Sequence, residues 1–168
     1  MAKLPEYNLQ SLYEMRERSK KETEDEYAKR QQELHKEQEI LTKMEKTLQD
    51  MKALRTQKTA EYSIAMQQQH LTIEKIQSNG RHIESLKDKE KEFQNQIETQ
   101  KEAVNAAKQR SEEALKVMLD ATQEFKVLEK HKEKWLYDIK KEIMKKEEEA
   151  AEEIAQAQYV SKSKNDDG

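Results

Sequence analysis

An apolar residue recurs about every seven residues, in one register, along most of this chain. Such a heptad repeat buries a narrow stripe between helices and leaves no globular core. Helix breakers are correspondingly rare, since the 168 residues include only Gly80, Gly168 and Pro5. The composition, 40% charged and 33% hydrophobic, is typical of either a disordered polymer or a long helix, and the periodicity favours the helix. We therefore predict an all-α fold of long coiled-coil helices.

The repeat is strongest in the second half of the chain. Of seventeen successive seam positions there, thirteen are apolar and four are polar. This regularity exceeds what chance gives in a sequence one-third hydrophobic, and the repeated alanines allow a neighbouring helix to approach closely. The seam positions are Ile83, Leu86, Glu90, Phe93, Ile97, Gln100, Val104, Ala107, Ser111, Ala114, Met118, Ala121, Phe125, Leu128, Lys132, Trp135 and Ile139.

The first half carries a weaker repeat. Pro5 interrupts any helix before it, Asn8 can cap a helix, and Ser11 with Glu14 has the spacing of a capping box. We therefore expect the first helix to begin between Asn8 and Ser11. Its seam is best in the middle and looser toward the start, with apolar positions at Leu34, Leu41, Leu48, Met44 and Met51 and then at Leu9, Leu12, Tyr13 and Tyr27.

Between the two seams the heptad positions are mostly polar, so we expect the chain to fold back there. Two turns compete. The Ser-Asn-Gly triplet at 78–80 tolerates a left-handed backbone, whereas residues 66–71 are mostly polar and precede a potential Thr72 cap. The sequence leaves the turn between Met66 and Gly80.

The seam loosens after Ile139, and the residues from Tyr159 onward carry no pattern. A second helix that is longer than the first would leave its last turns unpaired, and an unpaired helix frays or needs a partner. The expected segments are an N-terminal lead over 1–7, a first helix over 8–66, a turn region over 67–80, a second helix over 72–158 and a disordered tail over 159–168.

Two architectures fit this periodicity. One is an antiparallel hairpin of the two helices. The other is a single uninterrupted helix in a parallel homodimer, because the heptad register does not slip between Leu34 and Ile139. The two differ in length and in oligomeric state, and the periodicity alone leaves both open.

Composition and spacing argue against several classes of function. The 32 basic and 35 acidic residues are finely interspersed, so we expect no nucleic-acid partner. Without cysteine, without paired histidines and without a glycine-rich loop, we expect no metal, no nucleotide and no other cofactor. The carboxylates have no cleft to hold them, so we expect no enzyme. No apolar run suits a bilayer or a signal peptide, which predicts a cytoplasmic protein without stable membrane insertion.

The segment over 126–146 is basic and amphipathic, although acidic residues interrupt it. Such a helix suits an anionic membrane, a helix-binding groove or an acidic protein cavity. Trp135 lies on the seam, where a packed core aromatic is the simplest interpretation. Leu136 and Tyr137 face away from the seam, and their exposure would favour a docking surface.

Four segments of the sequence resemble the FliJ/YscO family of type III secretion proteins. The opening "YNLQSLYEMRER" is similar to the aromatic, leucines and Arg-Glu pair with which that family begins. The later segments "HIESL", "KEAVNAA" and "HKEKW" follow in the order and spacing of its chlamydial-type virulence members. The matching residues at the start are Tyr7, Leu9, Leu12, Arg16 and Glu17.

The resemblance implies a non-enzymatic antiparallel hairpin, similar in shape to a rotary-ATPase gamma subunit, with an early turn near Met66 to Thr72. It also implies three partners, which are the hexameric export ATPase, the cytoplasmic domain of the export gate and secretion chaperones. The stalk would promote ATPase assembly and turnover at the cytoplasmic face of the secretion apparatus, and we expect a monomer when it is alone. The candidate ATPase contacts are Leu9, Leu12, Arg16, His131, Trp135, Leu136 and Tyr137. The candidate gate contacts are His82, Ile83 and Leu86, of which His82 departs from the aromatic usual in the family.

Two other functions remain open from the sequence. A homodimeric coiled-coil scaffold would use the unbroken register, and a coiled-coil chaperone would use hairpin arms. Prefoldin-like chaperones also need strands at the base of the hairpin, and no alternating apolar run predicts them here.

Overall fold

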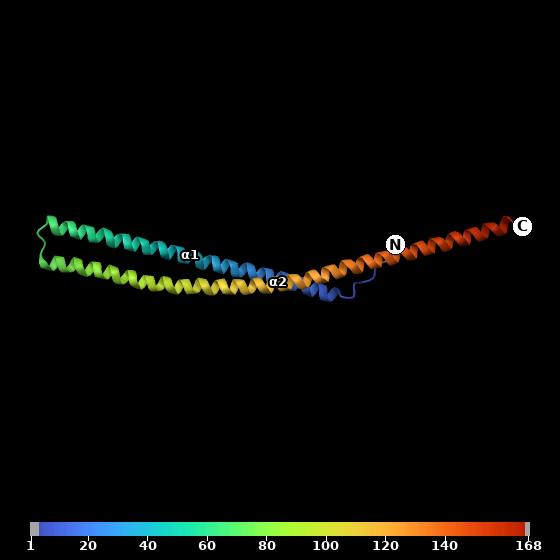
Figure 1. Cartoon of the computed structure of the whole chain (residues 1–168), viewed down its shortest axis with the longest axis horizontal. Coiled ribbons are helices and arrows are strands. Elements are labelled where there is room, and N and C mark those ends of the chain that lie inside the picture. Colours follow the sequence, from blue (N-terminus) through green and yellow to red (C-terminus); the bar gives the residue numbers. More distant parts are fainter. Residues whose placement is uncertain (1–3, 167–168) are drawn as a thin grey trace. The chain divides into compact units, whose positions relative to one another are not determined.

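The computed structural model describes residues 4–166 and consists of two long helices. Helix α1 spans Gln10–Gln68 and helix α2 spans Ile73–Asp166, and the described residues contain no strand (Figure 1). The two helices pack against each other in opposite directions. The predicted all-α coiled-coil hairpin is therefore confirmed, and the parallel rod is not the fold of this chain.

The turn occupies residues 69–72, in the earlier of the two candidate regions. Helix α1 ends among glutamines that bring no apolar side chain to the seam. Thr72 caps α2, because its Oγ1 accepts a hydrogen bond from the Lys75 backbone N–H at 3.3 Å. The Ser-Asn-Gly triplet lies inside α2, and no described residue has a positive φ. Gly80 is therefore an ordinary helical residue here.

The outer ends of the two helices compare differently with the expected bounds. Helix α1 begins at Gln10, within the expected start between Asn8 and Ser11, whereas α2 continues beyond residue 158 to Asp166. The segment expected as a disordered tail, 159–168, is thus helical up to Asp166, while residues 167–168 lie outside the described part. Because no glycine or proline stands between Gly80 and Gly168, the sequence supplies no stop signal earlier than the terminus.

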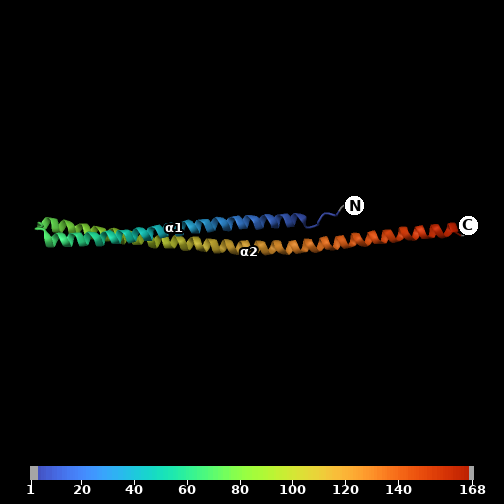
Figure 2. The same cartoon turned by 90° about the horizontal axis from the view of Figure 1, so that it is seen from above.

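Two compact units divide the chain. One holds Glu24–Lys116, which includes the turn, and the other combines the residues up to Thr23 with those from Val117 onward. In the first unit the two helices run side by side away from the turn, as the teal ribbon of α1 and the green-to-yellow ribbon of α2 show in Figures 1 and 2. Leu48, Ile97 and Ala107 form its apolar core, at 8%, 1% and 1% exposure.

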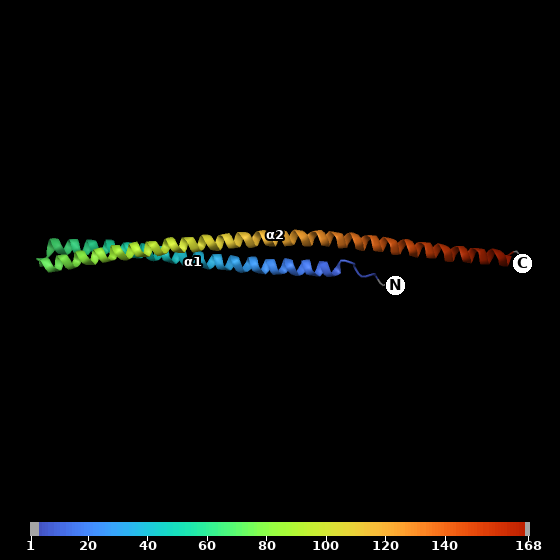
Figure 3. The ribbon, with the colours of Figure 1, turned by 90° about the horizontal axis from the view of Figure 1, so that it is seen from below.

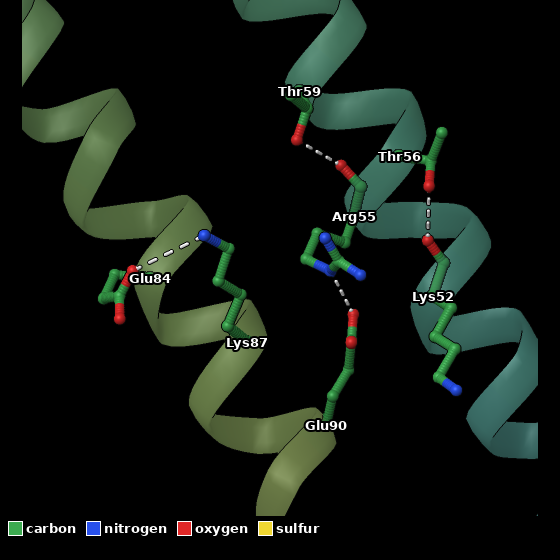
Figure 4. Close-up of polar contacts among 7 residues, drawn as sticks. All are labelled: Lys52, Arg55, Thr56, Thr59, Glu84, Lys87 and Glu90. Atoms are coloured by element: carbon green, nitrogen blue, oxygen red, sulfur yellow. Dashed lines mark hydrogen bonds and ion pairs between the residues drawn. The ribbon is translucent and has the colours of Figure 1, made fainter.

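Polar residues of the α2 seam are each paired with α1 inside this unit. Arg55 Nε donates to Glu90 Oε1 at 2.7 Å, a contact that bridges the two ribbons in Figure 4. Gln100 Nε2 donates to the Glu37 backbone oxygen at 3.1 Å and to its Oε2 at 2.5 Å. These pairs satisfy the polar seam residues in the observed antiparallel register.

Ser111 completes the set in this unit. It is 3% exposed, and its Oγ accepts a hydrogen bond from Gln31 Nε2 at 2.8 Å. Glu90 pairs with Arg55, and the later α2 residue Ser111 pairs with the earlier α1 residue Gln31. This reversed order is that of two antiparallel helices.

The second unit packs the start of the chain on the later half of α2. Tyr7, Ala121 and Phe125 are buried, at 5%, 7% and 5% exposure. Arg16 and Glu124 form an ion pair across the helices. Considering both units, all seventeen predicted seam positions of α2 are buried or half-buried, which confirms the heptad prediction.

Candidate partner-binding surfaces

Three aromatic rings hold the extended start of the chain on α2. The Tyr7 hydroxyl hydrogen-bonds to His131 Nδ1 at 2.5 Å, and the Tyr7 and Trp135 ring centroids are 5.1 Å apart with a tilt of 54°. Tilted rings at this distance are a favoured aromatic geometry. Tyr7 precedes α1, so this contact extends the pairing beyond the first helical turn. We call Tyr7, Tyr13, His131, Lys132 and Trp135 the terminal cluster.

Lys132 lies on the seam inside this cluster, yet its charge is satisfied. Its Nζ lies 4.1 Å from the Tyr13 ring centroid and 5.9 Å from that of Tyr7. The same atom donates a hydrogen bond to Gln10 Oε1 at 3.0 Å. A cation over aromatic faces keeps a favourable environment while its aliphatic stem fills the seam.

Tyr13 is a second aromatic anchor, with its ring centroid 5.1 Å from that of Phe125. Burial raises the pKa of its phenol above the ordinary 10.0, and the carboxylates of Glu17, Glu129 and Glu133 raise it further. The neutral phenol is therefore the form that the folded state favours.

The residues predicted to contact the ATPase lie within or beside the terminal cluster. Leu9, Leu12 and Leu136 are half-buried, as are Arg16 and Trp135. Arg16 is engaged with Glu124, Trp135 with Tyr7, and His131 with Tyr7. Tyr137 is 65% exposed and faces solvent. The structure thus brings these seven predicted residues to one region, with Tyr137 and Leu136 on its outer side.

A second tyrosine–histidine pair lies near the turn. The Tyr62 hydroxyl hydrogen-bonds to His82 Nδ1 at 2.6 Å, and the ring centroids are 5.9 Å apart. His82 is exposed and Tyr62 is half-buried. Unlike the pair at Tyr7, this one carries no tryptophan and no lysine above the rings among the contacts of the described residues.

A shallow apolar hollow of about 290 Å³ adjoins this pair. Several large apolar residues around it are solvent-exposed, including Met66 at 61% and Ile76 at 40%. Gly80 contributes to the open space, because a Cβ at that position would meet nothing within 4 Å. The hollow is lined in part by Tyr62, Met66, Leu71, Ile76, Gly80 and Ile83, which we call the turn cluster together with His82.

The predicted gate contacts fall in the turn cluster or next to it. Ile83 lines the hollow, His82 pairs with Tyr62, and Leu86 is half-buried one turn further along α2. The early part of α2 therefore presents both an apolar recess and an exposed imidazole.

Sequence reasoning missed two features. It treated Tyr7 as part of a lead before the first helix, although Tyr7 is among the most buried residues described. The heptad gives no signal for this packing, because Tyr7 precedes the helix. It also read the polar seam near the turn as a poor interface, and so did not foresee the hollow, which Tyr62 and Ile83 line from seam positions.

Within residues 4–166, no set of three acidic or histidine side chains is arranged to hold a metal ion. No helix in that range combines the length and apolarity needed to cross a bilayer.

Comparison with known proteins identifies the family. The model of YscO-like proteins matches residues 4–165, which is nearly the whole chain. The chain belongs to the YscO-like family. The family is a non-catalytic one of type III secretion, which makes this chain a stalk-like component of that system.

The fold is also known from a solved structure. It is similar to CT670 of Chlamydia trachomatis, a proposed YscO homologue, with a TM-score of 0.73 and 22% sequence identity. The match covers 92% of this chain and 95% of that chain, and it is a likeness of fold. A search of curated proteins finds no match.

Proposed function

We propose that this YscO-like protein is the stalk that couples a hexameric export ATPase to the type III export gate. It binds the ATPase ring, as a gamma subunit does, and promotes assembly and turnover of the ring. It catalyses no reaction itself and acts at the cytoplasmic face of the secretion apparatus. The observation that carries the proposal is the terminal cluster, where a rigid aromatic anchor presents Leu136 and the exposed Tyr137 beside a basic helix face.

The terminal cluster suits a ring contact for two reasons. First, Tyr7, Trp135 and Lys132 hold the start of the chain and α2 together, so a partner meets a preformed surface and loses little binding free energy to ordering. Second, the exposed Tyr137 is one of the residue types that are enriched in interface hot spots, and the half-buried Leu136 beside it adds apolar surface.

ATP hydrolysis by the cognate ATPase tests this proposal. We expect the wild-type chain to raise the turnover rate and the double change Leu136→Ala with Tyr137→Ala to remove the stimulation. The double change Val117→Ala with Leu119→Ala is a matched control, because these residues are 56% and 54% exposed on the same helix. No stimulation by a folded wild-type chain, or equal loss in the control, would refute the ring contact.

We propose the turn cluster as the contact for the cytoplasmic domain of the export gate, with secretion chaperones using the same early part of α2. Ile83 and the hollow offer an apolar recess, and His82 an exposed polar neighbour. Calorimetric titration with the gate domain should show weaker binding for Ile76→Asp, which alters an exposed wall of the hollow, and unchanged binding for Tyr137→Ala. The reverse pattern would contradict the assignment.

A further inference from the structure

The outer side of α2 in the second unit carries a line of lysines. Figure 3 shows the start of α1 (blue) along one side of this part of α2 (orange), and no ribbon covers the opposite side. Lys126, Lys130, Lys134 and Lys141 are all exposed, and the last of them and its two nearer neighbours lie within about 40° of Lys130 around the helix axis. We call this face of α2, over residues 126–144, the lysine strip.

The acidic residues of the same segment are mostly turned to the sides. Asp138 and Glu142 lie about 80° and 120° from Lys130 in one direction, and Glu129 lies about 100° from it in the other. Of the acids in this segment, only Glu133 lies within about 60° of Lys130. None of the four lysines forms an ion pair within the described part of the chain. Charges that alternate along the sequence are therefore separated in space, and the strip is positive although the chain has a net charge of -3.

Exposed apolar side chains accompany the lysines. Val127, Tyr137 and Met144 lie on the same face and are 60%, 65% and 60% exposed. They have no part in the hairpin, because the seam that includes Phe125 and Trp135 is the face turned to the start of the chain. A helix face that joins several lysines with aromatic and aliphatic residues is typical of helices that lie on an anionic bilayer.

We propose that the lysine strip is a peripheral binding surface for anionic phospholipid. The lysine ammonium groups contact the headgroup phosphates, while their aliphatic stems and the side chains of Val127, Tyr137 and Met144 contact the outer boundary of the acyl chains. The helix lies along the membrane surface and does not enter the bilayer as a span. Among the described residues no helix has the length and apolarity for a span.

An acidic protein is the alternative partner, and the shape of the strip favours lipid. The strip is the convex side of one helix and extends about 27 Å from Lys126 to Met144. A protein would need a matching row of carboxylates together with recesses for three apolar side chains. Lipid headgroups are mobile and adjust to each lysine, and the acyl boundary accepts apolar side chains without preformed recesses. The inference does not rest on the proposed coupling function, and the test leaves Tyr137, which the proposed ring contact also uses, unchanged.

Flotation of the full chain with lipid vesicles tests the inference. We expect binding to vesicles of phosphatidylcholine and phosphatidylglycerol in roughly equal amounts, and at least about tenfold weaker binding to phosphatidylcholine alone or at high salt. Lys130→Glu with Lys141→Glu should weaken binding at least about thirtyfold, because each lysine near an anionic surface contributes about a fivefold gain in affinity.

Lys146→Glu with Lys164→Glu is the matched control for that pair. It changes the net charge equally, and both exposed residues lie about 160° from Lys130 around the helix. A helix is about 10 Å across, which exceeds the screening length of about 8 Å at physiological salt, so we expect a change below about threefold. Circular dichroism establishes that both double variants stay helical.

A fluorescent label locates the contact independently, since the chain contains no cysteine. An environment-sensitive fluorophore on Met144→Cys should brighten with the mixed vesicles, whereas the same fluorophore on Lys146→Cys should not. Absence of binding to the mixed vesicles overturns the inference, as does equal weakening by the control pair. Binding to soluble polyglutamate without binding to vesicles also overturns it, and would assign the strip to an acidic protein instead.

Discussion

The terminal cluster and the turn cluster each pair a tyrosine of the N-terminal half with a histidine of α2, but they bury very different surfaces. Tyr7 is 5% exposed beneath His131 and Trp135, while Tyr62 is half-buried and its partner His82 faces solvent. Both histidines are exposed, so the two regions differ in the tyrosine, which belongs to a packed core in one and is only half-buried in the other. The comparison teaches that the aromatic neighbours, rather than the tyrosine–histidine bond, decide how firmly each region is held.

Truncating the two tyrosines should separate the clusters most clearly. We expect Tyr7→Ala to lower the free energy of unfolding of its region by about 3 kcal/mol, because it empties a buried aromatic site. Tyr62→Ala should cost below about 1.5 kcal/mol, since it removes a partly exposed contact. Denaturant unfolding of both variants measures the difference. Equal losses in the free energy of unfolding would contradict the proposed difference between the two clusters.

Removing a polar partner should cost a more similar free energy of unfolding in the two units than removing an aromatic side chain does. Arg55→Ala leaves the Glu90 carboxylate, whose side chain is 11% exposed, without its guanidinium and should cost about 2 kcal/mol. Lys132→Ala removes the cation above Tyr13 and should cost about 1 kcal/mol. Thermal unfolding compares them, with the exposed Lys52→Ala as a control expected to change nothing. If Arg55→Ala proves as neutral as that control, the polar seam does not hold the register.

Changing Gly80 of the turn cluster to alanine should stabilise the folded chain without altering the helix there. Gly80→Ala places a methyl group in open space within a helix, so the free energy of unfolding should rise by about 1 kcal/mol. Thermal unfolding measures the gain. A loss of stability would mean that the backbone at Gly80 is not helical.

A smaller effect concerns pH in the terminal cluster. The pKa of Tyr13 is raised in the folded state, chiefly by burial, so the folded chain keeps the phenol proton above pH 10.0 while the unfolded chain releases it. This contribution to stability is complete below pH 10.0 and is lost as the pH rises through the folded pKa. Tyr13→Phe should therefore lose less stability on going to alkaline pH than the wild type, by a few tenths of a kcal/mol. Parallel alkaline unfolding curves would contradict the shift.

The fold could be predicted from the sequence because coiled-coil packing depends on a periodic pattern. Residues such as Ile97 and Ala107 fall on the seam, and their burial follows from the heptad. The turn could not be placed as securely, since the Ser-Asn-Gly triplet has better turn chemistry than the segment used. There the Thr72 cap and the helical register of Ile76 outweigh the local preference of glycine.

The candidate surfaces were only partly predictable. Leu136 and Tyr137 could be identified as off-seam apolar residues, because their position on a helix depends on spacing alone. The burial of Tyr7 and the hollow beside Gly80 could not, since Tyr7 precedes the heptad and the heptad does not show that a hollow lies between the seam residues Tyr62 and Ile83. Such contacts depend on three-dimensional packing that no one-dimensional period records.

Hydrogen–deuterium exchange of the chain with and without the cognate ATPase tests the coupling proposal most directly. We predict that the ATPase slows exchange over the start of the chain through Arg16 and over α2 around His131 to Tyr137, and leaves the amides around Tyr62 and His82 unchanged. Protection confined to the turn cluster, or no protection at saturating ATPase, would contradict the proposal that the terminal cluster binds the ring.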